Sequence, residues 1–392
     1  MATASLYPLA NKEELMKLFV GKSLKDVPTP AAVLDLSKLK SNCSRMLEAV
    51  DALKFGWRAH IKTHKTAELT RLQVGGGIGP VNIIVSTIIE AENVLPLLLE
   101  YKSAGRVVNV LYSFPITPSA VPGLALVSKT LASTIPSVFL KIDMGGHRAG
   151  IAPQTAACST LISSLLALES QGHLHLLGLY SHAGHSYSSS NRASALDYLR
   201  QEFESLFVTS SAVHSISPSK PLVLSVGATP TTTSVRNLLV EDGEGVSEEE
   251  VKAIAALKAT IEAIREEKCS IEIHAGVYPI LDIQQLATHA LPSTLLSYPN
   301  QALTILTEIA SLYPSRGKPL SNSPTSPPTS EALLASGSLA LGREPCKAYP
   351  GWGILSPWNR PGVIMPTCPP EEYRGWIGMG KERGKMWRRS WR

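Results

Sequence analysis

The chain has 392 residues, more than one ordinary hydrophobic core accommodates, which predicts two domains. With 44% apolar and 18% charged residues, the composition is typical of a globular protein and excludes an intrinsically disordered one. The net charge of +5 does not indicate nucleic-acid binding, because six of the basic residues lie between residues 381 and 392.

Cysteine spacing and hydropathy bear on the compartment. The 5 cysteines are far apart and form no CxxC pair, which favours free thiols in a reducing compartment. Residues 1–20 contain no apolar run of signal-peptide length, and no stretch is long and apolar enough to span a bilayer. We therefore expect a cytoplasmic protein that binds neither membranes nor nucleic acid.

Strand-like and helix-like segments alternate through most of the chain without hairpin turns. This alternation favours parallel βα units, and about eight strands imply a (β/α)8 TIM-type barrel over residues 29–290. The helices expected between the strands span 37–53, 66–74, 88–102, 154–171, 191–216 and 247–268. The expected strands span 29–36, 58–65, 81–87, 106–112, 137–143, 174–180, 221–226 and 269–274.

The segments outside the barrel have a different texture. Residues 1–28 form an N-terminal extension in which Asn11 to Val20 has helical apolar spacing. Residues 300–380 contain short apolar segments split by Gly and Pro, which predicts a smaller, mostly β C-terminal domain. Within it, residues 321–330 (SNSPTSPPTS) are of low complexity and predict a flexible insertion. Residues 381–392 form an atypical basic tail.

Residues 58–65 (RAHIKTHK) carry the most informative motif. If they form a strand, His60, Lys62 and His64 share one face, because side chains alternate along a strand. A charged face flanked by imidazoles fills a core poorly, since buried unpaired charge is costly. A lysine held in a polar pocket can form a Schiff base, although a basic, solvated edge strand would show the same pattern.

Four more motifs follow expected strands, where a barrel places its active site. Small residues and hydroxyls at 225–231 would let backbone amides approach a phosphate. His182 and His185 could be metal ligands at a three-residue spacing, but we favour loop histidines, with an acid/base or orienting role left open. The motifs are GGHRAG at 145–150, YSHAGHSY at 180–187, SVGATPT at 225–231 and EIHAGVY at 272–278.

Together these motifs resemble the eukaryotic (fungal-type) D-serine dehydratase and D-threonine aldolase group of alanine-racemase-like, fold type III enzymes. Residues 58–65 resemble its R-P-H-V-K-T-H-K signature, with Ala59 for proline and Ile61 for valine. The later loops resemble K-I-D-T-G-x-H-R-A-G, S-x-G-x-T-P and E-x-x-P-G-x-Y, as well as the cofactor-contacting loop of the group. The resemblance extends from about Thr29 to Ile377.

The resemblance implies a pyridoxal 5'-phosphate (PLP) lyase in which Lys62 forms the Schiff base and, once released, removes the α-proton of D-serine. Loss of the β-hydroxyl then leads to pyruvate and ammonia. By the same resemblance Arg148 faces the phenolic oxygen of PLP, and Gly276 and Val277 bind its phosphate through backbone amides. The cofactor-binding residues it implies are Lys62, Arg148, Tyr180, Tyr187, Thr229, Gly276 and Val277. A small D-amino acid is the expected substrate, and a homodimer the expected assembly.

The family also uses a zinc ion to activate the leaving hydroxyl, held by a late segment with E-H-G and H-x-C. Here no histidine follows His289 and no H-x-C occurs, so zinc is expected for the family but no metal ligands are found. From Gly378 onward the sequence departs from the family pattern, which indicates a truncated or divergent end to the C-terminal domain. We therefore predict the PLP half of the site without its zinc half.

Other activities fit the same lysine site. The near alternative is D-threonine aldolase or a related D-3-hydroxyamino-acid enzyme. A racemase is disfavoured by the H-x-K-T-H context of Lys62. An alternative of another class is a non-catalytic PLP-binding protein, which the missing zinc ligands keep open.

Overall fold

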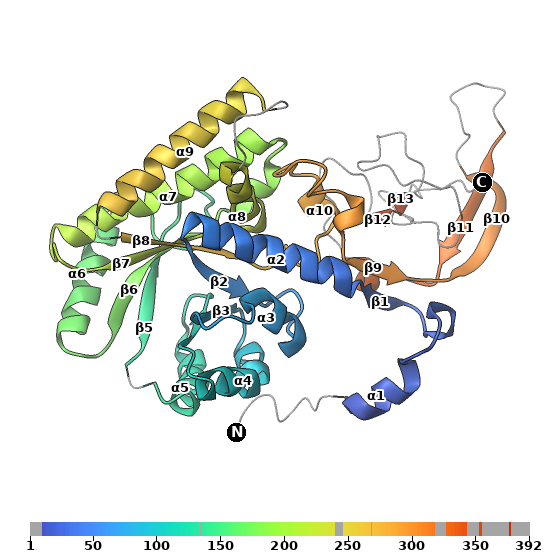
Figure 1. Cartoon of the computed structure of the whole chain (residues 1–392), viewed down its shortest axis with the longest axis horizontal. Helices are drawn as coiled ribbons and strands as arrows, with labels where there is room; N and C mark the ends of the chain where they lie inside the picture. The colour runs from blue at the N-terminus through green and yellow to red at the C-terminus, as the bar shows by residue number, and fades with distance from the viewer. Residues whose placement is uncertain are drawn as a thin grey trace. The chain divides into compact units, whose positions relative to one another are not determined.

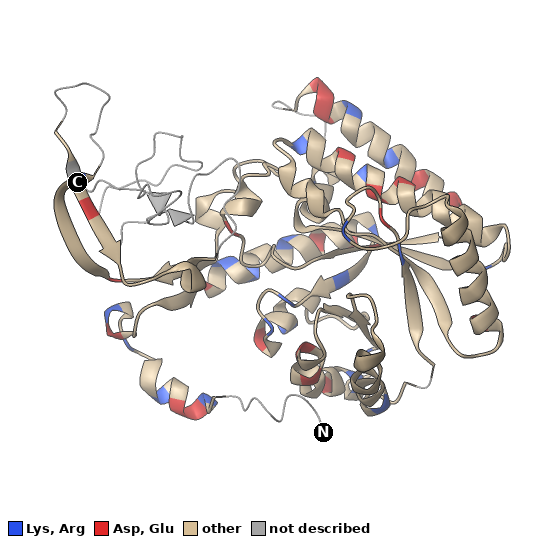
Figure 2. Ribbon diagram, turned by 180° about the vertical axis from the view of Figure 1, so that it is seen from behind, with Lys and Arg blue, Asp and Glu red and all other residues tan. Residues whose placement is uncertain are grey.

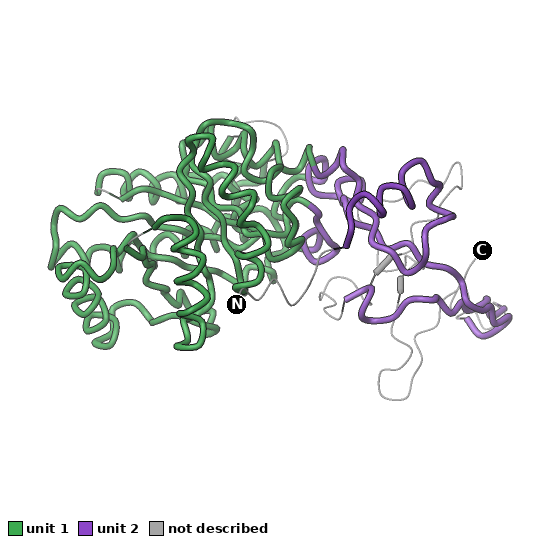
Figure 3. Tube along the Cα trace, turned by 90° about the horizontal axis from the view of Figure 1, so that it is seen from below, with its two compact units in different colours: residues 1–8, 40–279, 288–292 green, residues 9–39, 280–287, 293–392 purple. Residues whose placement is uncertain are grey.

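The computed structural model describes residues 10–133, 135–239, 246–267, 269–317, 327–342, 353–354 and 376–377. The chain divides into two compact units (Figure 3). Unit 1 contains residues 40–279 and 288–292, and unit 2 contains residues 9–39, 280–287 and the chain from 293 onward. The division differs from the predicted boundaries at 29 and 290, because the chain between 9 and 39 groups with the C-terminal part.

Unit 1 is built on a sheet of seven parallel strands in the order β4-β3-β2-β8-β7-β6-β5 (Figure 1). Parallel pairing requires a crossover between consecutive strands, and helices supply it. The parallel α/β arrangement predicted from the sequence is confirmed. The strands are β2 (Gly56–His60), β3 (Val81–Val85), β4 (Val108–Tyr112), β5 (Ser137–Lys141), β6 (His175–Tyr180), β7 (Leu222–Val226) and β8 (Cys269–Ala275).

Five of the helices in this unit begin at a capping side chain. Five caps accept the backbone N–H three residues further on, which stabilises a helix by about 1 kcal/mol each. They are Thr66, Thr87, Thr155, Asn191 and Ser247. The helices are α2 (Leu36–Leu53), α3 (Ala67–Val74), α4 (Ile88–Ser103), α5 (Val121–Thr130), α6 (Ala156–Ser170), α7 (Arg192–His214), α8 (Thr229–Ser234) and α9 (Glu248–Glu266).

The core lies between the strands and these helices. Charged residues are spread over the helices, whereas the strands are mostly uncharged (Figure 2). Helices α7 and α9 pack on the β6–β8 half of the sheet, and α4 packs on β3 and β4. Burying each large apolar side chain contributes about 1.5–3 kcal/mol. Buried residues of the larger cluster include Leu179, Phe203, Leu224, Leu257, Ile261 and Ile273, and those of the smaller one Ile61, Ile83, Val94 and Leu98.

One of the eight strands predicted for the barrel does not join the parallel sheet. Residues expected as a barrel strand at 29–36 form β1 (Ala31–Leu34), which pairs antiparallel with β9 (Leu303–Leu306) in unit 2. A short apolar run does not identify the strand that will pair with it. Between β4 and β5 the described residues form η3 (Pro118–Ala120) and α5 but no strand, so β4 and β5 stand at the two ends of the sheet.

Hydrogen–deuterium exchange should distinguish these two ends from the centre of the sheet. An end strand leaves one row of its backbone groups outside the ladder. We expect amides of β4 and β5 to exchange at least about tenfold faster than those of β7 and β8, whose inner residues are buried. Equal protection of all four strands would contradict the seven-strand order.

Unit 2 is a separate antiparallel β region, as predicted. Besides β1 and β9, strand β10 (Ile309–Gly317) pairs with β11 (Thr329–Leu334), and β12 (Gly353–Ile354) with β13 (Trp376–Ile377). The insertion predicted at 321–330 lies outside the described residues up to 326, and its last two residues belong to β11. The basic tail at 381–392 also lies outside them. The helices are α1 (Lys12–Phe19), α10 (Ile283–Leu286) and α11 (Ser338–Leu341).

Among the described helices, none combines the length and the apolar character that a bilayer crossing needs.

Candidate active site

Lys62 lies immediately after β2, at the carboxyl end of that strand. The predicted strand over 58–65 is too long: β2 ends at His60, and a turn follows. The N–H of Lys65 bonds to the carbonyl of Ile61 at 2.8 Å, which closes the turn. His64 consequently turns toward α3, where its Nε2 lies 2.8 Å from Oε1 of Gln73. His60, Lys62 and His64 therefore do not share one face of a strand.

The charge of Lys62 acts on several groups around it. Burial, and after it the charge of Lys62, lowers the pKa of His60 well below its usual value. Burial is also the main reason that the pKa of His182 falls to about 4. Burial, then Arg148 and Lys62, lowers the pKa of Lys141. Three cations thus lie near two neutral imidazoles, an environment that attracts an anionic ligand.

Residues after β7 and β8 meet beside the carboxyl end of β2. Thr229 begins α8 and is buried, and its Oγ1 accepts the N–H of Val277 at 3.2 Å. A Cβ placed on Gly276 would lie 2.9 Å from the carbonyl oxygen of His60, so the backbone passes close to β2 only because this residue is glycine. The structure therefore brings Thr229, Gly276 and Val277 to the end of β2 that precedes Lys62.

An aromatic cluster lies at the end of β6. The Tyr180 ring stacks on that of His274 with 4.4 Å between centroids and 6° between planes. The rings of His182 and His274 are 6.4 Å apart. Arg148 comes from the loop after β5, and a Cβ on Gly184 would lie 3.9 Å from its Nη1. Tyr187 is half-buried on η4 (Gly184–Ser188), within the same loop as His182.

Hydrogen bonds set the tautomers of two of these histidines. Nδ1 of His182 lies 2.7 Å from the carbonyl of Gly227, which can only accept, so Nδ1 carries the proton. The Ser225 hydroxyl donates to Glu272 at 2.7 Å, so it must accept from Nδ1 of His274 at 3.1 Å. The buried Nε2 of His274 is then a bare acceptor, and it has no hydrogen-bond partner among the described residues.

A buried ion pair supports this end of β8. Nε of Arg58 lies 2.7 Å from Oε1 of Glu272, and its Nη2 lies 3.1 Å from Oε2. Their side chains are 2% and 6% exposed. Asn109 accepts from Nη1 of Arg58 at 2.6 Å. Charge-assisted, two-pronged bonding of this kind fixes both side chains and, through Ser225, the ring of His274.

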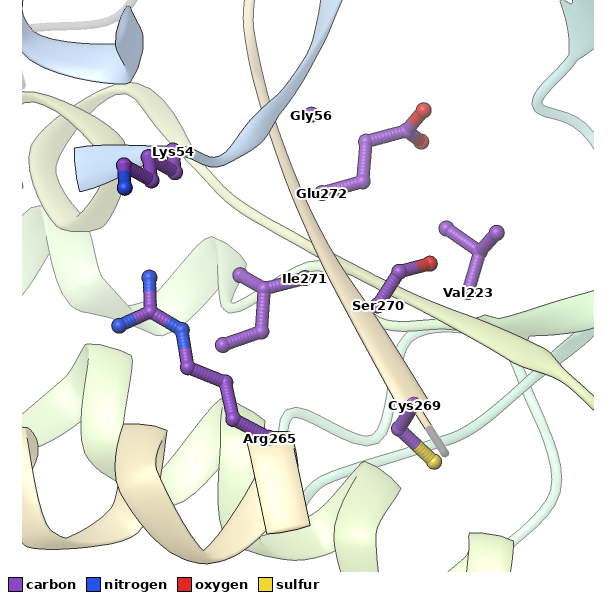
Figure 4. Close-up of a pocket in the computed structure, with 8 residues that line it drawn as sticks. All are labelled: Lys54, Gly56, Val223, Arg265, Cys269, Ser270, Ile271 and Glu272. Carbon is purple, nitrogen blue, oxygen red and sulfur yellow. The ribbon is translucent and has the colours of Figure 1, made fainter. Parts of the chain in front are cut away.

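The separate cavity shown in Figure 4 is not this site. It has a volume of about 290 Å³ and is lined by residues at the amino ends of β2, β7 and β8, with Lys54 and Arg265 at its edge. The candidate residues lie at the opposite, carboxyl ends of the strands, where parallel α/β sheets bind their ligands. The cavity is therefore not part of the candidate active site.

The arrangement fits PLP. Backbone N–H groups and the Thr229 hydroxyl suit a phosphate, and Gly276 lets this backbone approach the end of β2 closely. Lys62 provides the amine, and the bare Nε2 of buried His274 can accept a hydrogen bond from the ring side of a ligand. For zinc, no group of three or more potential ligands occurs among the described residues, and Cys346 and Cys368 lie outside them.

Two residues were missed by sequence reasoning. His274 stands where the family pattern has no fixed residue, and its only signal was a polar side chain at the buried end of a strand. Lys141 is the last residue of β5, and its Nζ lies 5.3 Å from the Tyr180 ring centroid. Its sequence offered no signal beyond its place before the GGHRAG loop.

The chain is similar to proteins of known activity. The alanine racemase N-terminal domain family matches residues 34–241. D-serine dehydratase of Schizosaccharomyces pombe is 34% identical over 368 residues, which cover 87% of this chain and 78% of that protein. The enzyme of the same name from Saccharomyces cerevisiae is 30% identical, covering 79% and 76%. The chain belongs to the D-serine dehydratase family. The recognition made from the motifs is confirmed, and the family consists of PLP-dependent lyases.

The fold of this chain is also similar to those of solved structures. D-threo-3-hydroxyaspartate dehydratase from Delftia sp. HT23 superimposes with a TM-score of 0.56 and 22% identity, covering 81% of this chain and 74% of that one. D-threonine aldolase from Filomicrobium marinum gives 0.57 and 19%, covering 87% and 80%. At these identities the likeness concerns the fold, and it confirms the alanine-racemase-like architecture.

Proposed function

We propose that this chain converts D-serine to pyruvate and ammonia, with PLP bound through Lys62. The observation that supports the proposal is that Thr229 and Val277 meet at the carboxyl ends of β7 and β8, next to the end of β2 that precedes Lys62. The 34% identity to a D-serine dehydratase supports the choice of substrate. The proposed small-molecule partner is therefore a D-amino acid with a β-hydroxyl.

Each residue has a proposed part in the reaction. Bound PLP would supply the electron sink. The Lys62 amine holds the cofactor and, when released, takes the proton from the substrate Cα as a general base. Thr229, Gly276 and Val277 hold the phosphate, while Tyr180, Tyr187 and Arg148 contact the remainder of the cofactor. His274 offers its Nε2 as a fixed acceptor on the floor of the site.

A product assay tests the proposal. D-serine should yield pyruvate and ammonia, whereas L-serine should yield neither. The D-threonine aldolase alternative predicts acetaldehyde and glycine from D-threonine at a higher rate than pyruvate from D-serine. A protein that takes up PLP and forms no product from either D-amino acid would favour the non-catalytic alternative.

Zinc content is a separate prediction. The chain has no histidine after His289 and no H-x-C, so the purified protein should contain far less than one tightly bound zinc per chain. Without a Lewis acid on the leaving hydroxyl, turnover should be slow and insensitive to chelator. Grafting a family-type C-terminus with E-H-G and H-x-C should raise both zinc content and rate. Stoichiometric zinc with full, chelator-sensitive activity would contradict this and direct attention to His182 and His185.

The assembly and compartment remain proposals. We propose a homodimer, which light scattering of the purified protein would test against a monomer. We also propose a cytoplasmic location, consistent with three buried free cysteines among the described residues.

A further inference from the structure

Glu202 is an unusual residue on α7. Its side chain is 0% exposed, yet within the described part of the chain no cationic side chain forms an ion pair with it. Burying a carboxylate without a counter-charge is costly unless hydrogen bonds replace its water. The surrounding helix offers apolar residues at its other buried positions, such as Phe203 and Leu206. A carboxylate at this position calls for an explanation other than packing.

The hydrogen bonds of Glu202 supply one. Its Oε1 accepts the backbone N–H of Ala183 at 2.8 Å and that of Gly227 at 3.3 Å. Its Oε2 accepts the hydroxyl of Thr231 at 2.9 Å. One side chain from α7 therefore connects the loop after β6 with the loop and first turn after β7.

The two loops are those that carry the cofactor candidates. Ala183 follows His182 and precedes η4, while Gly227 lies two residues before Thr229. Gly227 is held on its other side as well, because His182 donates to its carbonyl oxygen at 2.7 Å. A Cβ on Gly227 would lie 2.1 Å from the carbonyl oxygen of His274, so the backbone at Gly227 is tightly packed against the end of β8.

We propose that Glu202 is a positioning residue that joins the β6 and β7 loops and thereby sets the affinity for PLP. The inference rests on the proposed function in one respect, namely that these loops bind PLP. Glu202 is not a catalytic residue, since it reaches the cofactor candidates only through the backbone and Thr231. Its role is to hold Thr229 and the His182 loop at a fixed separation.

The hydrogen-bond pattern predicts which substitutions are tolerated. Glutamine can accept both N–H groups through Oε1 and donate through Nε2 to Oγ1 of Thr231. The Thr231 hydroxyl can then turn its proton to the carbonyl of Ala228, which lies 3.1 Å away. Alanine can do none of this and leaves two buried N–H groups without an acceptor. The side chain at position 202 therefore needs the length of glutamate and its hydrogen-bond acceptors more than it needs a negative charge.

PLP titration of the full-length apoprotein, followed by absorbance, tests the proposal. Glu202→Ala should raise the Kd for PLP by about tenfold to a hundredfold. This range is typical of residues that hydrogen-bond to the groups in direct contact with a ligand. Glu202→Gln should stay within about threefold of the unsubstituted protein. The matched control is Glu204→Ala on the same helix, whose partner is Arg200 and whose side chain is 44% exposed. It should leave the Kd unchanged.

A second variant decides the case in which Glu202→Ala does not fold. Glu202→Asp keeps the carboxylate but shortens its reach by one methylene, so it too should weaken PLP binding by at least about tenfold. An unchanged Kd in Glu202→Asp or in folded Glu202→Ala would overturn the proposal. Failure of the unsubstituted protein to bind PLP would instead refute the proposed function, so the two failures are distinguishable.

The pH dependence of apoprotein stability provides a readout that simple packing would not change. Burial raises the pKa of Glu202 to about 7, above the usual range of a glutamate, so its charged form destabilises the fold. Glu202 should therefore contribute a component of stability that falls as pH rises from about 5 to 7, and Glu202→Gln should lose this component. The lowered pKa values of the buried residues His60, His182 and His274 act in the opposite sense over part of this range, so the readout is the difference in pH slope between the unsubstituted protein and Glu202→Gln. An identical slope in Glu202→Gln would show that Glu202 does not ionise as proposed.

Discussion

Replacing Lys62 by alanine should lower D-serine turnover by at least about a thousandfold and remove covalently bound PLP. Both effects would have one cause, since the proposed function gives the same amine the tasks of holding the cofactor and taking the substrate proton. The phosphate contacts would remain, because Thr229 and Val277 come from other strands. Noncovalent PLP should therefore still bind, although more weakly. Steady-state pyruvate formation and absorbance after gel filtration measure the two effects.

Lys65→Ala is the matched control within the same motif. Lys65 is exposed, and its Nζ donates to the carbonyl of Lys62 at 2.8 Å rather than entering the site. This variant should retain covalent PLP. If Lys65→Ala lost the adduct while Lys62→Ala kept it, the assignment of the reactive lysine would be reversed.

Replacing Glu272 by alanine should lower the free energy of unfolding by about 3–5 kcal/mol. Arg58 would then be a buried cation without its counter-charge, and Ser225 would lose the acceptor of its hydroxyl proton. Because Ser225 also sets the tautomer of His274, PLP binding should weaken as well. Urea unfolding of the apoprotein measures the change in stability.

The exposed pair of Arg71 and Glu100 provides the control. It is also two-pronged, with Nη1 of Arg71 lying 2.7 Å from Oε1 of Glu100, but Glu100 is 57% exposed. Water can replace the lost partner there, so Glu100→Ala should leave the unfolding midpoint unchanged. Equal losses in the two variants would contradict the interpretation that burial makes the Glu272 pair important.

The motifs allowed the loops of the site to be predicted because each follows a strand, and parallel strands end at one edge. Thr229 and Val277 lie 48 positions apart in sequence but meet through a hydrogen bond for this reason. The end of β2 was misjudged because alternation of side chains does not register the turn that Lys65 closes. His60, Lys62 and His64 fit a strand pattern that the backbone abandons after His60.

Other features depended on tertiary pairing that a single sequence does not encode locally. The strand at Ala31–Leu34 has the same apolar character as those of the parallel sheet, but it pairs with Leu303–Leu306. Glu202 reads as one more polar residue on an amphipathic helix until its two loops are placed around it. His274 likewise became meaningful only when Ser225 fixed its tautomer. The roles of these residues follow from their burial and from the residues they contact, which the residue type alone does not show.

The proposed chemistry depends most directly on which lysine carries PLP. Borohydride reduction of the PLP-loaded protein, followed by proteolysis and mass spectrometry, locates the pyridoxyl group on a single residue. We expect it on Lys62, on the peptide that follows β2. A pyridoxyl group on Lys65 or Lys141 instead, with Lys62 unmodified, would contradict the account.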